Sequence, residues 1–139
     1  MSLADWLNEG KLKSHRTRKN EINQLISVYE RDLKDALVIN LSTDRRFATA
    51  YNAALMITIA ALAAGANHHY WSIQSLAFTL QPDVQTIKKF DNFRRKRNIS
   101  DYERIGMVSE REVSEVIDLA KNLKTMLDQW LPENHPELI

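Results

Sequence analysis

The sequence predicts an all-α protein, an antiparallel bundle of four or five helices folded as one domain over residues 1–139. Three observations lead to this prediction. Glycine and proline occur only three times each in 139 residues, alternating strand patterns are nearly missing, and apolar residues recur at helical spacing along most of the chain. A chain of this length fits a single hydrophobic core. We place that core at residues 18–131 and expect a short N-terminal helix and a C-terminal tail at its periphery.

The first two helices follow from a cap, a glycine and an apolar stripe. Ser2 is placed to cap a short helix over residues 3–8, which Gly10 ends. After a basic connection, a second helix is predicted from about residue 18 to residue 39. Its apolar residues keep a period of 3.6 and form one face for the core, namely Ile22, Leu25, Ile26, Tyr29, Leu33, Ala36 and Leu37.

The third predicted helix is rich in alanine and is expected at the centre of the bundle. Ser42 or Thr43 caps it, and it continues to Ala64, where a glycine follows. Its second half is apolar almost all round, which is typical of a helix with neighbours on several sides. A core helix built from a good helix former explains the alanines equally well. Tyr51 and Asn52 are its polar residues, and each should need a hydrogen-bond partner if it is buried.

Two shorter helices are predicted next. One covers residues 68–80, and the following one runs from Pro82, a residue suited to a first helical position, to about Arg97. Residues 98–104 either continue this helix or break it. Gly106 is a firm stop.

The last helix is predicted from a capping box and a long apolar stripe. The box is the Ser-Glu-Arg-Glu sequence of residues 109–112, and the helix covers about residues 110–131. Residues 132–139 are expected to form a loose tail. The buried stripe consists of Val113, Val116, Ile117, Ala120, Leu123, Leu127 and Trp130.

Composition and charge exclude several classes of protein. The net charge of +1 gives no overall signature of nucleic-acid or membrane binding, so any basic surface has to be local. Without cysteine, neither a disulfide nor a thiolate metal site can form. Residues 1–13 have no signal-peptide pattern, and the longest apolar run, residues 53–66, is shorter than the roughly 20 residues of a membrane span. We therefore expect a cytoplasmic protein that does not associate with a membrane.

One arginine lies at an unusual position. In a helix, Ile87, Phe90, Phe93 and Arg97 share one face, and Asn98 follows directly. A guanidinium on an apolar stripe needs acceptors or an anion from a ligand. The alternative interpretation is an arginine near a helix C-terminus that is favoured by the helix dipole and extends into solvent.

This arginine belongs to a local basic cluster. As a functional site, the cluster would bind the phosphate groups of a nucleotide or a nucleic acid. As a solvated surface, it would be balanced by the acidic residues around it. The candidate phosphate-binding residues are Arg94, Arg95, Lys96, Arg97 and Arg104.

With its helices placed, the chain resembles the HEPN superfamily, and in particular its small stand-alone bacterial members. The resemblance rests on RRFATAYNAAL at residues 45–55, on HHY at residues 68–70, and on Arg97-Asn98 followed by DYE at residues 101–103. It implies a bundle of four or five helices that commonly forms a symmetric dimer. It also implies that the arginine motif lines a cleft where two protomers meet.

Many HEPN proteins are metal-independent ribonucleases, whose motif is arginine, asparagine, three residues and histidine. Here Arg97 and Asn98 match, and Tyr102 takes the place of the histidine. A tyrosine with an ordinary pKa of about 10 is a poor base at neutral pH, whereas a histidine is suited to proton transfer. His68 or His69 could replace it, because a helix N-terminus favours the neutral imidazole. Alternatively, one of these histidines packs locally and the other is solvated.

Three functions remain in order of preference. The first is a HEPN-type module that forms a homodimer, binds a nucleotide or RNA at Arg97, and acts beside a nucleotidyltransferase-type or other partner, as in toxin–antitoxin or defence pairs. The second is a metal-independent endoribonuclease that uses Arg97 with His68, His69 or Tyr102. The third is a structural helical protein that docks a partner. We expect no cofactor and no metal, because no set of residues has the spacing of a metal site.

Overall fold

The protein is all-helical in the part of the chain that the computed structural model describes, which is residues 2–10, 18–62, 73–99 and 106–138. No strand occurs in these residues. The α-helices are α1 (Leu3–Asn8), α2 (Lys19–Ala36), α3 (Thr43–Leu62), α5 (Val84–Arg97) and α7 (Glu110–Asn134), and short 3-10 helices cover Ser75–Ala77 and Pro136–Leu138.

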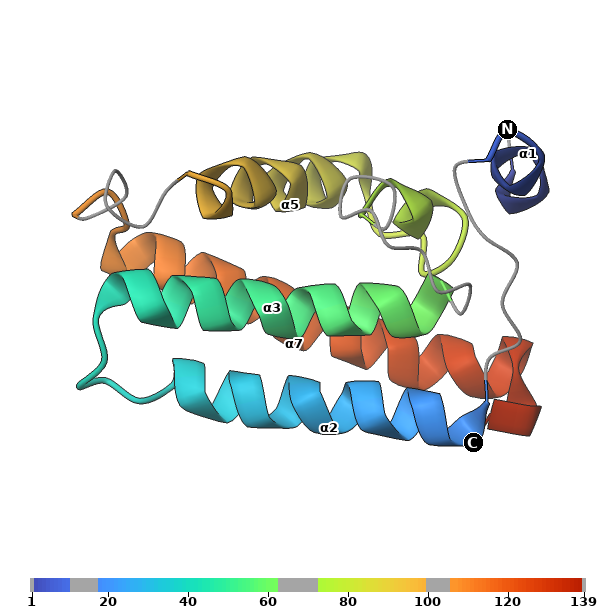
Figure 1. Ribbon diagram of the computed structural model, residues 1–139, viewed down its shortest axis with the longest axis horizontal. Helices are drawn as coiled ribbons and strands as arrows, with labels where there is room; N and C mark the ends of the chain where they lie inside the picture. Colours follow the sequence, from blue (N-terminus) through green and yellow to red (C-terminus); the bar gives the residue numbers. More distant parts are fainter. Residues whose placement is uncertain (1, 11–17, 63–72, 100–105, 139) are drawn as a thin grey trace.

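The four long helices run antiparallel to one another in chain order (Figure 1). Helix α3 lies between α2 and α5, and α7 crosses behind it, so that α3 has neighbours on three sides. The central position predicted for the alanine-rich helix is therefore confirmed.

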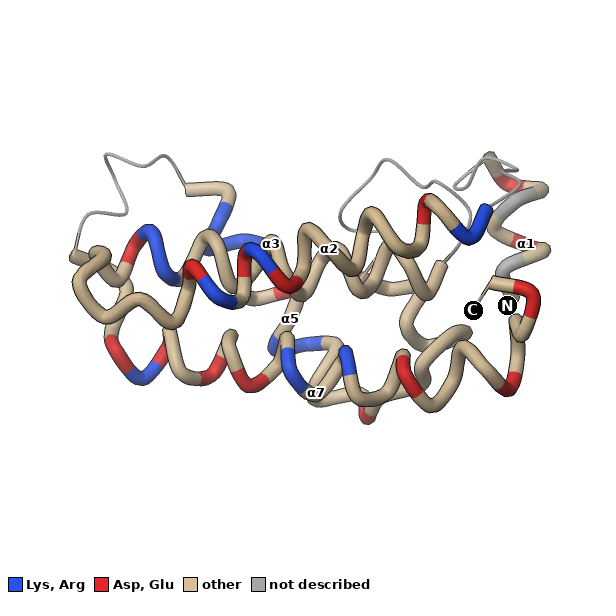
Figure 2. The backbone as a smooth tube through the Cα atoms, turned by 90° about the horizontal axis from the view of Figure 1, so that it is seen from below, with Lys and Arg blue, Asp and Glu red and all other residues tan. Residues whose placement is uncertain are grey.

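Basic and acidic residues are interspersed along the helices instead of forming one face of a single sign (Figure 2).

The small residues of α3 let its neighbours approach closely, while two of its aromatic residues connect it to α5. The Phe47 and Phe93 rings meet edge to face with centroids 5.8 Å apart, and the Tyr51 and Phe90 rings do so at 5.7 Å. Such pairs stabilise a core beyond the area that they bury. The alanines of α3 that are fully buried or nearly so are Ala50, Ala53, Ala54, Ala60 and Ala61.

Two predicted helix boundaries were wrong by two or three residues. Helix α2 ends at Ala36 instead of residue 39, and the apolar residues 37–39 are exposed in the turn that follows. Helix α5 begins at Val84, because the Asp83 side chain accepts a hydrogen bond from the Thr86 amide and so acts as the N-cap. Proline 82 lies before this cap and not in the first helical position.

The C-terminal tail is more ordered than the sequence indicated. Helix α7 continues through Pro132 to Asn134, and residues 136–138 form a 3-10 turn. The Leu138 side chain is only 7% exposed, and the His135 ring packs on the ring of Trp130 with centroids 5.1 Å apart. Apolar burial thus holds a segment that proline and polar residues predict to be loose.

In the described part of the predicted helix over residues 68–80, residues 73–74 are α-helical, but the chain does not continue as a regular helix. After residue 74 the chain forms the 3-10 turn at Ser75–Ala77 and then a turn that closes with a hydrogen bond from the Gln81 amide to the Leu76 carbonyl. Residues 63–72, which include the predicted end of the third helix, lie outside the described residues. None of the helices described is both long and apolar enough to cross a membrane.

Candidate functional site

The basic cluster lies on the last turn of α5, at the end of the bundle where α3 and α7 begin (Figure 1). All four residues of that turn, 94–97, are cations. Asn98 is the C-cap, and its backbone amide donates a hydrogen bond to the Arg94 carbonyl. Positive charge is favourable at this end of a helix because the dipole is negative there. The local sequence therefore forms a stable helix end that also concentrates positive charge.

Arg94, Arg95 and Lys96 form ion pairs with carboxylates of the described residues. Arg94 Nε lies 2.8 Å from Asp91 Oδ1, and Arg95 Nη2 lies 3.2 Å from Asp91 Oδ2. Lys96 forms an ion pair with Glu112 of α7. The Asp91 side chain is only 10% exposed, so that its two oxygens are largely committed to the arginines. The cluster is thus an ordered network, which differs from a broad basic surface open to solvent.

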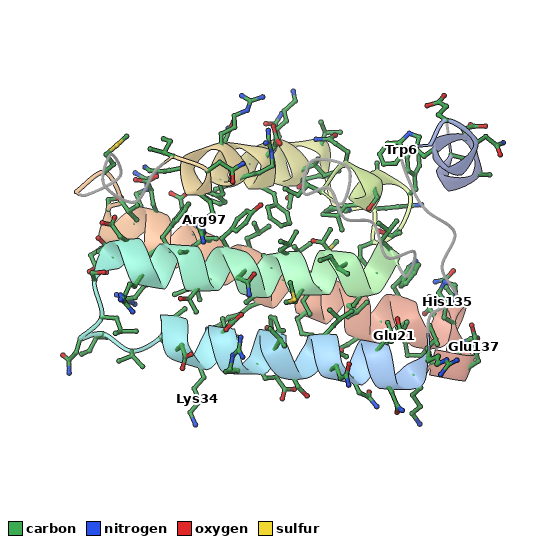
Figure 3. All side chains as sticks on the ribbon, viewed as in Figure 1. Trp6, Glu21, Lys34, Arg97, His135 and Glu137 are labelled. Carbon is green, nitrogen blue, oxygen red and sulfur yellow. The ribbon has the colours of Figure 1, made fainter. Side chains whose placement is uncertain are left out.

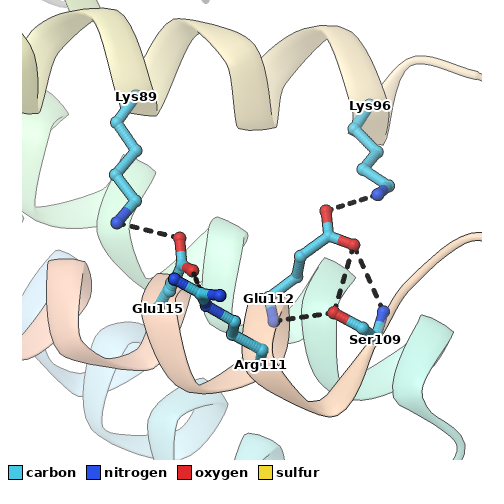
Figure 4. Close-up of polar contacts among 6 residues, drawn as sticks. All are labelled: Lys89, Lys96, Ser109, Arg111, Glu112 and Glu115. Atoms are coloured by element: carbon cyan, nitrogen blue, oxygen red, sulfur yellow. Dashed lines mark hydrogen bonds and ion pairs between the residues drawn. The ribbon is translucent and has the colours of Figure 1, made fainter.

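The network also fixes α5 to α7 (Figure 4). Lys89 Nζ lies 2.8 Å from Glu115 Oε2, while Lys96 contacts Glu112, which is also the acidic residue of the capping box with Ser109. Burial opposes ionisation of Glu112, but hydrogen bonds from Lys96 and Ser109 outweigh it and lower the pKa of this carboxyl. The predicted capping box is confirmed, and it serves the site by anchoring the residue that holds Lys96.

Arg97 differs from its three neighbours in direction. It is exposed, and its side chain extends from the end of α5 toward α3 (Figure 3). Its charge acts on the Tyr51 hydroxyl of α3, as does that of Arg94. Asn98, the second residue of the predicted motif, is exposed directly after it. Arg97 therefore combines both interpretations of the sequence, because it reaches solvent and yet lies beside the α3–α5 interface.

Tyr51 is the buried polar residue of this interface. The side chain is 2% exposed, and its hydroxyl oxygen has no hydrogen-bond partner among the described residues. Burial raises the pKa of Tyr51 to about 12, although the charges of Arg94 and Arg97 act in the opposite direction. The hydroxyl therefore stays protonated at neutral pH, and it is available as a donor.

Asn52, the next residue, is fully explained by the structure. Its amide donates a hydrogen bond to Asp32 of α2, which is 5% exposed and is also held by Arg31 at 3.1 Å. Asp32 was not singled out from the sequence. Asp91 was expected as one of the acidic residues that balance the basic cluster, and its ion pairs with Arg94 and Arg95 agree with that interpretation.

Four of the candidate residues lie outside the described residues, namely His68, His69, Tyr102 and Arg104. The structure thus brings together Tyr51, Arg94 and Arg97, and places Arg95 and Lys96 on separate carboxylates. No group of three or more metal-binding side chains is found in the part of the chain that is described.

Comparison of the chain with protein-family models, with curated proteins and with solved structures found no match. Any function proposed for the chain therefore rests on its own residues. The strongest of these observations is a cationic helix end that faces a buried tyrosine hydroxyl for which the described residues supply no partner.

Proposed function

We propose that this chain is a HEPN-type helical module that forms a homodimer and binds the phosphate groups of a nucleotide or an RNA at Arg97. A nucleotidyltransferase-type or other protein would be its partner, in a toxin–antitoxin or defence pair. The observation that carries the proposal is the position of Arg97, which is exposed at the end of α5 and directed toward α3. The motif residues Arg97 and Asn98 are contiguous at this end of the helix.

A phosphate suits this site better than a neutral ligand does. Arginine is the residue that binds phosphate with two parallel hydrogen bonds, and it keeps its charge at any physiological pH. Asp91 and Glu112 neutralise much of the remaining positive charge of the turn. The site is therefore expected to hold one or two phosphates and not to follow a long nucleic-acid backbone.

Rigid support favours binding at this position. Phe90 and Phe93 fix α5 on α3 through two aromatic contacts, and the ion pairs of Lys89 and Lys96 fix it on α7. The backbone that carries the binding side chain is therefore already ordered before a ligand arrives. This geometry supports a preorganised site over an incidental surface charge.

The test compares two arginine variants of the full chain in binding to a fluorescent single-stranded RNA, measured by anisotropy at several salt concentrations. Arg97→Gln is expected to weaken binding about tenfold or more and to lower the salt dependence by about one phosphate contact. Arg18→Gln is the matched control, because it removes the same charge from an exposed residue at the start of α2, at the far end of the bundle. Equal losses in both variants would show non-specific attraction, and the proposal would be wrong.

Two further measurements address the remaining parts of the proposal. Sedimentation equilibrium is expected to give twice the chain mass of 16.1 kDa, and a monomer at micromolar concentration would contradict the dimer. Incubation of the protein with RNA in EDTA separates binding from catalysis. If the wild type cleaves RNA and Arg97→Gln does not, the protein is a metal-independent endoribonuclease and not only a binding module.

A further inference from the structure

The Tyr51 hydroxyl is a buried polar group at the interface of α3 with α5. Its oxygen has less than 1 Å² of exposed surface and no hydrogen-bond partner among the residues described. A buried polar group without a partner is unfavourable for folding, so its presence calls for a reason. Asp44 Oδ1 is also buried without a described partner, but it lies in the first turn of α3, where the helix dipole stabilises a carboxylate. No such compensation applies to Tyr51.

The position of Tyr51 directs its hydroxyl toward the arginines of α5. A helical side chain leans toward the N-terminus of its helix, and α3 begins at the end of the bundle where α5 finishes. The Tyr51 ring contacts Phe90, and Arg94 and Arg97 follow Phe90 by four and seven residues on the same face of α5. The hydroxyl therefore extends from the aromatic contact toward the two guanidinium groups, whose charges act on it.

We infer that the Tyr51 hydroxyl is a binding group of the site, a hydrogen-bond donor to an oxyanion whose charge Arg97 neutralises, with Arg94, itself paired with Asp91, nearby. This inference rests on the proposed function and adds the chemistry that the site recognises. Two guanidinium groups alone attract any anion. A neutral hydroxyl near them adds a directional donor, which is strongest toward a charged oxygen and so favours a phosphate group over a halide.

The protonation state and the accessibility of the hydroxyl agree with this role. Because burial raises the pKa of Tyr51 to about 12, the group keeps its proton at neutral pH and does not repel the anion. Because the hydroxyl is buried, a ligand can reach it only when side chains around it move. Arg97 is exposed, and exposed side chains change rotamer within nanoseconds.

The experiment uses the full chain, with inorganic phosphate and a fluorescent single-stranded RNA as separate probes, and it compares Tyr51→Phe with Tyr29→Phe. Tyr29 is also buried, but it lies on α2 near Asp128. Tyr29→Phe therefore removes a tyrosine hydroxyl from a different interface. Tyr51→Phe is expected to weaken the binding of both probes about tenfold, since a hydrogen bond to a charged group is lost. Tyr29→Phe is expected to leave both affinities unchanged.

The outcomes separate this inference from the proposed function. If Arg97→Gln loses affinity while Tyr51→Phe binds as wild type, the hydroxyl has no role, although the phosphate site stands. If neither variant loses affinity, both are wrong. If RNA binding is weakened and phosphate binding is not, the hydroxyl contacts a base or a sugar, and the inference that it binds an oxyanion is wrong.

Stability provides an independent measurement. Because the described residues supply no partner for the hydroxyl, Tyr51→Phe is expected to melt at the wild-type temperature or above it when phosphate is absent. A fall in melting temperature of more than about 3 °C would show that the hydroxyl is bonded inside the folded protein. That result would overturn the inference even if binding were reduced.

Discussion

Arg46 allows a sharp test of what holds the end of the bundle together. Its side chain is 11% exposed, its Nε donates a hydrogen bond to the Ala36 carbonyl at 2.8 Å, and its Nη1 lies 3.0 Å from Glu110 Oε2. The Ala36 carbonyl is one of the last four of α2, which have no partner within their helix. Arg46 therefore joins the end of α2 to the starts of α3 and α7.

The two interactions of Arg46 differ in expected strength. A hydrogen bond from a charged donor to a buried carbonyl contributes about 1.5 to 3 kcal/mol. The ion pair contributes at most about 1 kcal/mol, because Glu110 is 73% exposed and solvent screens it. Arg46→Met keeps the apolar stem and removes both interactions, so we expect it to lower the free energy of unfolding by about 2 to 3 kcal/mol.

Urea unfolding, followed by tryptophan fluorescence, measures this loss, and Glu110→Gln is the matched variant. We expect Glu110→Gln to cost less than about 1 kcal/mol, because it leaves the bond from Arg46 to the Ala36 carbonyl in place. Equal losses in the two variants would show that the ion pair is the stronger interaction, and the reasoning from burial would be refuted. A loss below about 0.5 kcal/mol in Arg46→Met would show that water satisfies the carbonyl equally well.

Three further predictions concern other parts of the molecule. Burial raises the pKa of Tyr51 to about 12 from its ordinary value of 10.0, so the folded state favours the neutral phenol. The contribution of this preference to the free energy of unfolding is fully present below pH 10 and is lost as the pH rises to 12. Relative to Tyr51→Phe, the wild type should lose about 3 kcal/mol of unfolding free energy across that range in urea titrations at fixed pH. Ser109→Ala should cost about 1 kcal/mol in the same assay by removing the cap of α7, whereas Ser114→Ala, which is exposed within the helix, should change stability by less than about 0.5 kcal/mol. Leu138→Ala should cost about 2 kcal/mol if the tail is docked, with exposed Glu137→Ala as its control, and equal melting temperatures of these two variants would show an undocked tail.

Local signals in the sequence were sufficient for most of the helices. The Ser2 cap, the capping box at Ser109 and the stripe through Phe90 and Phe93 depend on residues within one or two turns of each other, and all of them are found in the structure. The spacing of apolar residues also predicted the buried face of α2 correctly from Ile22 to Ala36. Such features are set by periodicity and by backbone groups that need partners nearby.

Features that depend on distant residues could not be predicted. The apolar stripe of α2 continues to Leu37, yet the helix ends at Ala36, whose carbonyl binds Arg46 from the next helix. The order of the tail depends on the burial of Leu138, which the local proline content does not indicate. In each case an interaction between elements overrides a local preference.

The two polar residues of the central helix show where a site can be expected in a core of this kind. Asn52 faces α2, and there the bundle supplies the buried carboxylate of Asp32 to pair with it. Tyr51 faces α5, and there the described residues supply the charges of Arg94, Arg97 and Asp91 but no hydrogen-bond partner. A hydrogen-bond donor near positive charges can bind an anion, whereas an amide that is already bonded to a carboxylate needs no further partner. Two adjacent residues of similar polarity thus differ in what they require, and the α3–α5 interface is the one that an anionic ligand would complete.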